Sequence, residues 1–260
     1  MYLETRPQQP PRTAKVLMLH GTGQSAHTFQ AKMRYLHEPI ARALFASSAL
    51  QSEFPYPGGV EFVYLDGPIP ASELDACDET YMKPNKLPDS WLWGYGDPET
   101  QELKGLEHTW KHLATVLNEH GPFVGVIGFS AGAAWSVILT ALLEQNLKTN
   151  PHFHVNHPPL QFCIAFSAFM FEHRTYEWIY ARKIQTPVLH FLAALDTWIT
   201  ERQSLKLVER CAHAQVEYFQ GSHYIPRGPR IKELVTKFIQ KTSGVGKELR
   251  PGGYEDWTDA

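Results

Sequence analysis

The stretch Phe123-Val-Gly-Val-Ile-Gly-Phe-Ser-Ala-Gly-Ala133 decides the fold. It contains the pentapeptide Gly128-Phe-Ser-Ala-Gly132, a G-x-S-x-G motif, between an apolar run at 123–127 and a nearly uncharged apolar stretch at 131–143. The run predicts a strand and the stretch predicts a helix. This is the context of a nucleophile elbow, in which a serine on a tight strand-to-helix turn exposes its Oγ. We therefore predict that Ser130 is a nucleophile, with an ordinary glycine-rich turn as the alternative.

Short apolar runs and helical patterns alternate along the rest of the chain. The runs that predict buried strands lie at 15–20, 60–65, 161–166, 188–192 and 216–219. Apolar residues at helical spacing predict helices at 28–50, 101–119, 201–211 and 230–240. Pro39 is a candidate point for a kink or break in the first of these helices. Such alternation is typical of an α/β fold, in which a mostly parallel sheet carries helices on both faces.

A nucleophilic serine needs a base, and the base needs a carboxylate that orients it. In folds with this elbow the chain order is serine, acid, histidine. Only three aspartates follow Ser130, and two of them, Asp256 and Asp259, lie close to the C-terminus. Asp196 follows the predicted strand 188–192 by a short loop, where an acid faces the crevice at the carboxyl end of a parallel sheet. We predict that Asp196 is the acid; the alternative, which is compatible, is an N-cap for the next helix.

His213 and His223 are the two histidines that follow Asp196. His213 lies near the end of a predicted helix, whereas His223 follows the last predicted strand in the turn Gln220-Gly-Ser-His223. A turn after a strand places an imidazole on the crevice side of the sheet, so we predict that His223 is the base. His20 ends the first predicted strand, and there we expect a structural role in orienting the loop that follows.

An oxyanion hole needs two preorganised donors. We expect one to be the backbone N–H of Ala131, directly after the nucleophile. The other is expected in the loop His20-Gly-Thr-Gly23 after the first predicted strand, and we assign it to the N–H of Thr22. A tight strand-to-helix turn is a compatible alternative role for that loop.

The segment 66–100 has no clean period and is rich in prolines and aromatic residues. A long connection of this kind inside a compact domain is usually functional. We predict that it forms a lid or an acyl pocket lined by Trp91, Trp93 and Tyr95, with Trp198 at the pocket mouth. Packing of the segment's aromatic residues at the edge of the core is the alternative.

Composition and charge exclude several other classes of protein. The chain has 260 residues, with 24 lysines and arginines against 27 aspartates and glutamates, so its formal net charge is −3. A chain with this charge has no overall positive electrostatic field to attract nucleic acid, which argues against a general nucleic-acid-binding protein. No apolar run approaches the ~18 residues of a membrane span, and the first residues lack the apolar core of a secretory signal. The scattered cysteines Cys77, Cys163 and Cys211 predict no disulfide framework, and we expect a cytoplasmic protein.

The remaining predictions concern metals, assembly and domain limits. His152, His154 and His157 lie in a proline-bounded stretch without a carboxylate or cysteine at ligand spacing, so we expect no metal there. We expect no cofactor, and the sequence does not indicate an oligomeric state. We expect one domain at 14–241, with a flexible N-terminal tail at 1–13 and a flexible C-terminal tail at 242–260.

Beyond these patterns, the chain resembles the FSH family of serine hydrolases, a branch of the α/β-hydrolase fold. The string Gly121-Pro-Phe-Val-Gly-Val-Ile-Gly-Phe-Ser-Ala-Gly-Ala133 is far more specific than the pentapeptide alone. The resemblance implies the fold and places the family's triad pattern on Ser130, Asp196 and His223. The chain departs from many members at Ala131, where they have glutamine. The other segments on which the resemblance rests are Val16-Leu-Met-Leu-His-Gly21, Asp66-Gly-Pro-Ile-Pro70, Gly105-Leu-Glu107, Asp196-Thr-Trp-Ile199 and Gly221-Ser-His223.

The resemblance also implies an activity, the hydrolysis of carboxylic esters, often with short to medium acyl chains. The chain is similar in layout to fungal members that release polyketide chains from a carrier as thioesterases, or trim esters, in biosynthetic clusters. The implied partner is a small-molecule ester or thioester, including an acyl chain on a carrier protein. Two alternatives stay open: a lyase, cyclase or acyltransferase that uses the same pocket, and a catalytically silent binding protein of the same fold.

Overall fold

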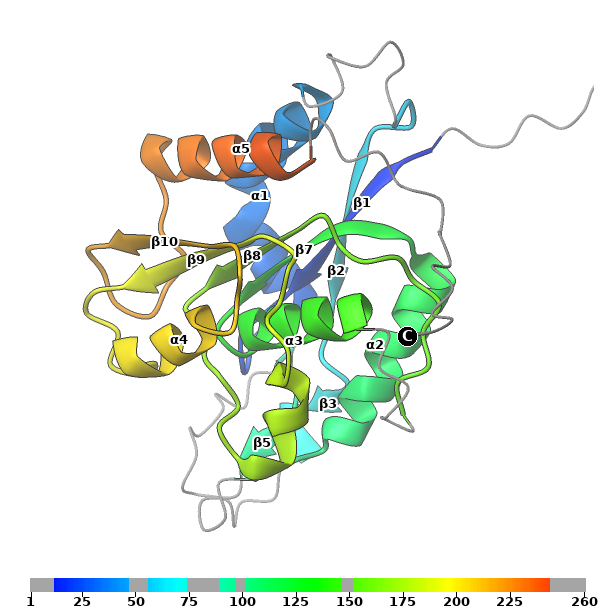
Figure 1. Ribbon diagram of the computed structural model, residues 1–260, viewed down its shortest axis with the longest axis vertical. Helices are drawn as coiled ribbons and strands as arrows, with labels where there is room; N and C mark the ends of the chain where they lie inside the picture. The colour runs from blue at the N-terminus through cyan, green and yellow to red at the C-terminus, as the bar shows by residue number, and fades with distance from the viewer. Residues whose placement is uncertain (1–11, 47–55, 74–88, 97–101, 146–151, 244–260) are drawn as a thin grey trace, which may run out of the picture.

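The computed structural model describes residues 12–46, 56–73, 89–96, 102–145 and 152–243. Its centre is a six-stranded sheet with the strand order β10-β9-β8-β7-β1-β2 (Figure 1). Every neighbouring pair in this sheet is parallel. The predicted mostly parallel α/β sheet is therefore confirmed. Its strands are β1 (Ala14–Leu19), β2 (Val60–Leu65), β7 (Phe123–Phe129), β8 (Phe162–Phe166), β9 (Val188–Ala193) and β10 (Ala214–Phe219).

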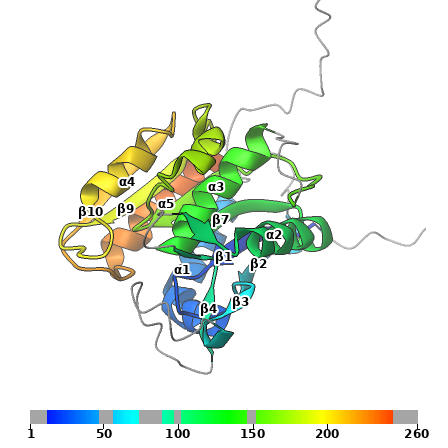
Figure 2. The same ribbon diagram turned by 90° about the horizontal axis from the view of Figure 1, so that it is seen from below.

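Helices cover both faces of the sheet (Figure 1 and Figure 2). One face carries α1 (Ala26–Ala46) and α5 (Pro229–Ser243), and the other carries α2 (Leu106–His120), α3 (Ala131–Gln145) and α4 (Glu201–Val208). Side chains alternate along β1 to build the two core layers: Val16 and Met18 join the layer of α1 and α5. Leu17 and Leu19 join the layer of α2 and α3. A strand buried on both faces explains why this run is continuously apolar.

The helices correspond to the predicted ones, but their limits differ: α4 ends at Val208 and not at 211, and α5 extends to Ser243. Helix α1 does not end at Pro39, because Leu36 and Ile40 on either side of it are fully buried against the core. Helix α2 begins at Leu106 and not at 101, because Gly105 before it adopts a left-handed φ of 73°. A seven-residue 3₁₀ helix, η2 (Arg174–Tyr180), was not predicted at all.

The described ends of the irregular segment 66–100 form short antiparallel ribbons. Strand β3 (Ile69–Pro70) pairs with β4 (Trp91–Leu92), and β5 (Tyr95–Gly96) pairs with β6 (Leu103–Lys104). A single 3₁₀ turn, η1 (Ala71–Glu73), follows β3. Residues 74–88 and 97–101 lie outside the described residues, as do most of the two predicted tails. The lid and the domain limits therefore stay predictions.

Within the described ranges, no helix combines the length and the apolar character needed to cross a membrane.

Candidate active site

Ser130 occupies the turn between β7 and α3. Its φ is 54°, in the left-handed region that non-glycine residues seldom adopt. The turn is held from both sides: the N–H of Ser130 donates to the carbonyl of Phe166 at 2.9 Å, and its carbonyl accepts from Ala133 at 2.9 Å and Ala134 at 3.0 Å. Strain of this kind persists only where neighbouring structure imposes it. The predicted elbow geometry is therefore present at Ser130.

The two glycines of the pentapeptide are required by close backbone contacts. A Cβ on Gly128 would lie 2.3 Å from the carbonyl oxygen of Gly132. A Cβ on Gly132 would lie 2.3 Å from the carbonyl oxygens of both Leu19 and His20. No side chain fits at such distances, so the first turn of α3 can pack against β7 and the end of β1 only with glycine at these positions.

The structure brings the three predicted side chains together in one hydrogen-bonded chain. The Nε2 atom of His223 lies 2.8 Å from Oγ of Ser130, and its Nδ1 atom lies 2.7 Å from Oδ2 of Asp196. An ionised carboxylate can only accept, so Nδ1 carries the proton and Nε2 is free to accept the serine hydroxyl proton. The side chains of His223 and Asp196 are only 14% and 3% exposed, so the hydrogen bond between them is largely shielded from water.

Backbone donors hold Asp196 as an anion. Its Oδ1 atom accepts from the N–H groups of Trp198 and Ile199, each at 2.9 Å. Burial by itself would raise the pKa of this carboxyl, but the hydrogen bonds from Ile199, His223 and Trp198 outweigh it and hold the pKa below its ordinary value. The alternative role as a helix cap is not the observed one, because Thr200 is the N-cap of α4.

Two backbone N–H groups of the turn after β1 are engaged in hydrogen bonds. The N–H of Gly23 donates to the carbonyl of Trp91 at 3.0 Å, and the N–H of Gln24 donates to that of Gly21 at 3.1 Å. The N–H of Thr22, the residue to which we assigned the second oxyanion donor, is not used by these bonds. Ala131 is the first residue of α3, and the first N–H groups of a helix have no partner within it.

His20 supports this turn from below. The N–H of Gly67 donates to its Nε2 at 2.9 Å, so the proton lies on Nδ1, which donates to the carbonyl of Gly21 at 2.8 Å. Burial lowers the pKa of His20 and keeps the ring neutral. Both ring nitrogens are thus engaged in ordering the loop, which is the structural role expected for this residue.

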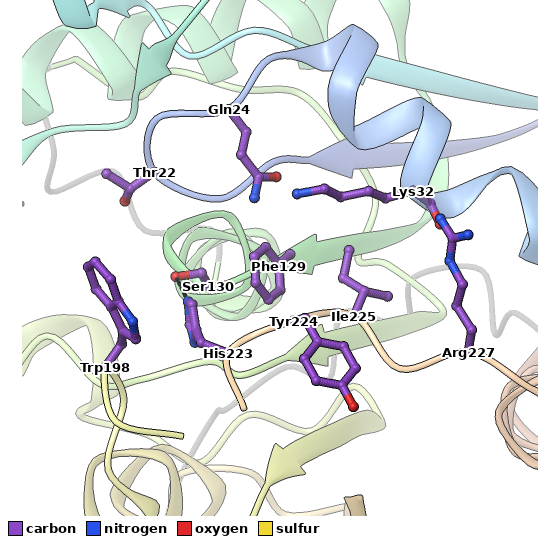
Figure 3. Close-up of a pocket in the computed structure, with 10 residues that line it drawn as sticks. All are labelled: Thr22, Gln24, Lys32, Phe129, Ser130, Trp198, His223, Tyr224, Ile225 and Arg227. Carbon is purple, nitrogen blue, oxygen red and sulfur yellow. Dashed lines mark hydrogen bonds between the residues drawn. The ribbon is translucent and has the colours of Figure 1, made fainter. Parts of the chain in front are cut away.

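A cavity of about 360 Å³ opens beside Ser130 (Figure 3). Trp198 stands at its edge: the side chain is 53% exposed, and its ring centroid lies 6.2 Å from that of His223. This placement agrees with the predicted pocket mouth. The lining residues are Thr22, Gln24, Lys32, Phe129, Ser130, Trp198, His223, Tyr224, Ile225 and Arg227.

Residues 10–235 match the model of the family described as Serine hydrolase (FSH1). The chain belongs to this family. The predicted family, the FSH family of serine hydrolases, is therefore confirmed.

The chain is similar to several relatives with curated names. A dihydrofolate reductase of Schizosaccharomyces pombe is 30% identical over 232 residues, which cover 86% of this chain and 46% of that protein. Esterase OVCA2 of Xenopus tropicalis is 26% identical over 248 residues, covering 92% of this chain and 97% of that esterase. The chain spans about half the length of the first two curated relatives it matches.

The fold also matches a solved structure. Acyl-protein thioesterase 2 of Zea mays superimposes with a TM-score of 0.57 at 17% identity, over 92% of this chain and 97% of that one. The predicted α/β-hydrolase fold is confirmed by this match and by the strand order above.

Three aromatic residues expected to line the pocket lie elsewhere. Trp93 is 1% exposed and donates its Nε1–H to the carbonyl of His20 at 2.8 Å. Trp91 pairs with Gln24 through its backbone, and Tyr95 packs against the small buried cluster that contains Ile69. None of the three borders the cavity beside Ser130. The Trp93 ring packs against the end of β1, and Tyr95 packs against the small cluster, so for these two residues the alternative of packing at the edge of the core fits the structure.

Six lining residues were missed by sequence reasoning. Five of them flank predicted residues in the chain: Gln24 follows the Thr22 turn, Phe129 precedes Ser130, and Tyr224, Ile225 and Arg227 follow His223. Their closeness in sequence to these predicted site residues was the only signal in the sequence that could have indicated that they border the cavity. Lys32 lies inside α1, and only the rotation of this helix on the sheet shows that it faces the cavity.

The histidine-rich stretch has a structural explanation at His157. The N–H of Phe123 donates to its Nε2 at 2.7 Å, and its Nδ1–H donates to the carbonyl of Pro158 at 2.6 Å. Burial lowers the pKa of His157, so the ring is a neutral bridge between this stretch and the start of β7. Among the described residues, no cluster of three or more histidine, cysteine, aspartate or glutamate side chains could hold a metal.

Proposed function

We propose that the protein hydrolyses carboxylic esters or thioesters through an acyl intermediate on Ser130. The observation that carries the proposal is the hydrogen-bonded chain from Ser130 through His223 to Asp196. Membership of the serine hydrolase family and the similarity to named esterases support the same reaction. Asp196, His223 and Ser130 are the proposed acid, base and nucleophile, and the N–H groups of Thr22 and Ala131 the proposed oxyanion hole.

Acylation is the first half of the proposed reaction. As Oγ of Ser130 forms a bond to the acyl carbon, Nε2 of His223 takes the hydroxyl proton and the carbonyl electron pair moves onto oxygen. Asp196 stabilises the imidazolium that results. The two oxyanion donors stabilise the negative charge, each by about 2.7–4 kcal/mol in comparable sites. The bond to the leaving alcohol or thiol then breaks, and the proton on His223 passes to the leaving group.

Deacylation repeats these steps with water. His223 takes a proton from water as the water oxygen attacks the acyl carbon of the Ser130 ester. The bond between Oγ and the acyl carbon breaks, the proton returns to Oγ, and a carboxylic acid leaves. Because Nδ1 of His223 stays hydrogen bonded to Asp196, the ring presents Nε2 in both halves of the reaction.

The proposed substrate is a small-molecule ester or thioester, or a polyketide-type acyl chain attached to a carrier protein. The resemblance to fungal esterases and thioesterases supports this choice, and a cavity of about 360 Å³ suits a small acyl group. We place the protein in the cytoplasm, because Cys163 and Cys211 are buried free thiols. Burial raises the pKa of Cys211 to about 12, so this thiol is not a second nucleophile.

A fluorophosphonate probe tests the proposal. It should add its mass to the peptide that contains Ser130, and Ser130→Ala should lose both the label and the hydrolysis of p-nitrophenyl butyrate. Circular dichroism of the variant provides the control for folding. If the folded wild-type protein neither reacts with the probe nor forms an acyl-Ser130 during turnover, a lyase, cyclase or silent binding protein replaces the hydrolase.

A further inference from the structure

Two positive side chains border the cavity on the side opposite Trp198. Figure 3 shows the amine of Lys32, from α1, directed toward the side-chain amide of Gln24, with Arg227 at the far end. The Nζ atom of Lys32 lies 6.0 Å from the centre of the Phe129 ring. The same ring lies 4.9 Å from the imidazole of His223. Phe129 therefore separates a cationic end of the cavity from its reacting end.

The cationic end has no negative partner in the described part of the chain. Among those residues, neither Lys32 nor Arg227 forms an ion pair, whereas Lys206 pairs with Glu172 and Lys237 pairs with Glu233. Arg227 instead lies over the ring of Tyr35, at 5.6 Å, and donates to the backbone carbonyl of Lys32 at 3.5 Å. Two like charges are thus held close together beside the nucleophile's cavity.

The state of Lys32 agrees with a ligand site. Burial, and then the positive charge of Arg227, lower the pKa of its ammonium. Removing an ammonium from water is costly unless an anion compensates for it. Gln24, which borders the same space, has a buried Oε1 atom without a donor among the described residues. An anionic ligand with a neighbouring hydroxyl or amide group would satisfy both side chains.

We propose that the substrate carries an anionic group, a carboxylate or a phosphate, which binds Lys32 and Arg227 while its ester or thioester lies at Ser130. The proposal rests on the proposed function and names its substrate class. The anion is either the far end of the acyl chain, as in a dicarboxylic half-ester, or part of the leaving group, as in a thioester of a phosphate-bearing thiol. Phe129 and Ile225 contact the apolar carbons in between.

The first test compares anionic with neutral substrates of equal length. One pair is p-nitrophenyl hemiglutarate and p-nitrophenyl pentanoate, and the other is S-acetyl-4′-phosphopantetheine and S-acetylpantetheine, which differ only in the phosphate. In the wild-type protein kcat/KM should favour the anionic member of one pair. In Lys32→Met this preference should fall by about tenfold or more, the value of a charge-assisted contact. Lys32→Arg should retain most of it, because the positive charge remains.

The matched control is Arg34→Gln, which removes one positive charge from the same helix. Arg34 is exposed and does not border the cavity, so its loss should leave the preference unchanged. A change confined to the ester pair places the anion on the acyl chain, and one confined to the thioester pair places it on the leaving group. Equal kcat/KM within both pairs, or equal losses in Lys32→Met and Arg34→Gln, would overturn the proposal while the hydrolase stands.

A binding measurement decides the proposal even if no substrate is turned over. Calorimetry of Ser130→Ala with glutarate, and separately with coenzyme A, should give a Kd that weakens about tenfold when Lys32→Met is added. Neutral pentanamide should bind both proteins equally. If neither anion binds better than pentanamide, the anion site is disproved. If an anion does bind but neither Ser130 labelling nor turnover occurs, the anion site stands and the hydrolase is disproved.

Discussion

Nε1 of Trp93 donates a hydrogen bond to the carbonyl oxygen of His20 at 2.8 Å, across 73 positions of sequence. The backbone carbonyl of Trp93 in turn accepts from the hydroxyl of Thr109 at 2.9 Å, which ties the Trp93 backbone to α2. Trp93 therefore contacts the start of the turn that carries Thr22, and it does not border the cavity beside Ser130. Removal of the Trp93 side chain should displace the proposed oxyanion donor at Thr22 and leave the preference for acyl chain length unchanged.

We expect Trp93→Ala to lower kcat for p-nitrophenyl esters by a similar factor at every acyl length. Its free energy of unfolding should fall by about 3–5 kcal/mol, the usual cost of truncating a buried tryptophan. Steady-state kinetics and urea unfolding provide both values. The comparison is Trp198→Ala, which removes an exposed ring at the cavity edge and should change stability by less than about 0.5 kcal/mol. A shift in chain-length preference confined to Trp93→Ala would contradict this assignment.

Asp196→Asn tests the proton position on His223. The asparagine keeps an oxygen for the N–H groups of Trp198 and Ile199, so its NH₂ group must face Nδ1 of His223. That donor forces the proton onto Nε2, which can then no longer accept the proton of Ser130. We expect kcat to fall by about 10³–10⁴-fold, as in other enzymes of this mechanism, with the fold intact.

The control for that variant is Asp196→Ala, which removes the acceptor for both N–H groups and should also destabilise the loop before α4. Near-wild-type turnover by Asp196→Asn would mean that Asp196 does not set the tautomer.

Sequence reasoning worked where local chemistry leaves few choices. The elbow at Ser130 was predictable because a tight strand-to-helix turn demands glycines at 128 and 132. Asp196 and His223 were predictable because few aspartates and histidines follow Ser130, and because both follow strands whose ends meet at one edge of the sheet.

Sequence reasoning failed where tertiary packing decides which way a side chain points or where a helix ends. Trp93 lies in a segment with no period, so nothing local shows that its ring packs against the end of β1 rather than in a cavity. Lys32 is one of several polar positions on α1, and the side that faces the cavity depends on how the helix docks. Pro39 does not end α1, because the burial of Leu36 and Ile40 outweighs the local cost of a proline.

Gly132→Ala should reduce stability and activity together. The added Cβ would lie 2.3 Å from two backbone oxygens, of Leu19 and His20, and backbone yields less readily than a flexible side chain. We expect the free energy of unfolding to fall by about 1–3 kcal/mol. Turnover should fall as well, because a shift of α3 moves the Ala131 N–H. Urea unfolding and steady-state kinetics measure the two effects.

Gly59→Ala is the matched control for a generic glycine substitution. A Cβ there meets nothing within 4 Å, although φ is 89°. Its cost should be backbone strain alone, about 1–2 kcal/mol, with kcat unchanged. Equal losses of kcat in the two variants would show that the contact of Gly132 with the end of β1 does not matter for the reaction.

His190 should make the folded state sensitive to acid. It lies on β9, is 1% exposed, and its described contact is between Nε2 and Sγ of Cys211 at 3.6 Å. Burial lowers its pKa from 6.5 to about 4, so the unfolded chain binds a proton on this residue at a higher pH than the folded chain does. Its contribution to stability is therefore complete above pH 6.5 and is lost as the pH falls toward 4.

The loss attributable to His190 amounts to about 3 kcal/mol across that window. Urea unfolding of the wild-type protein at several pH values between 7.5 and 4 should show the free energy of unfolding decreasing toward acid. Other buried histidines add to that slope, so the informative quantity is the difference from His190→Gln, which has no group to protonate. The variant should lose about 3 kcal/mol less over the same range. Parallel curves for the two proteins would show that His190 is protonated as readily in the folded state as in the unfolded chain.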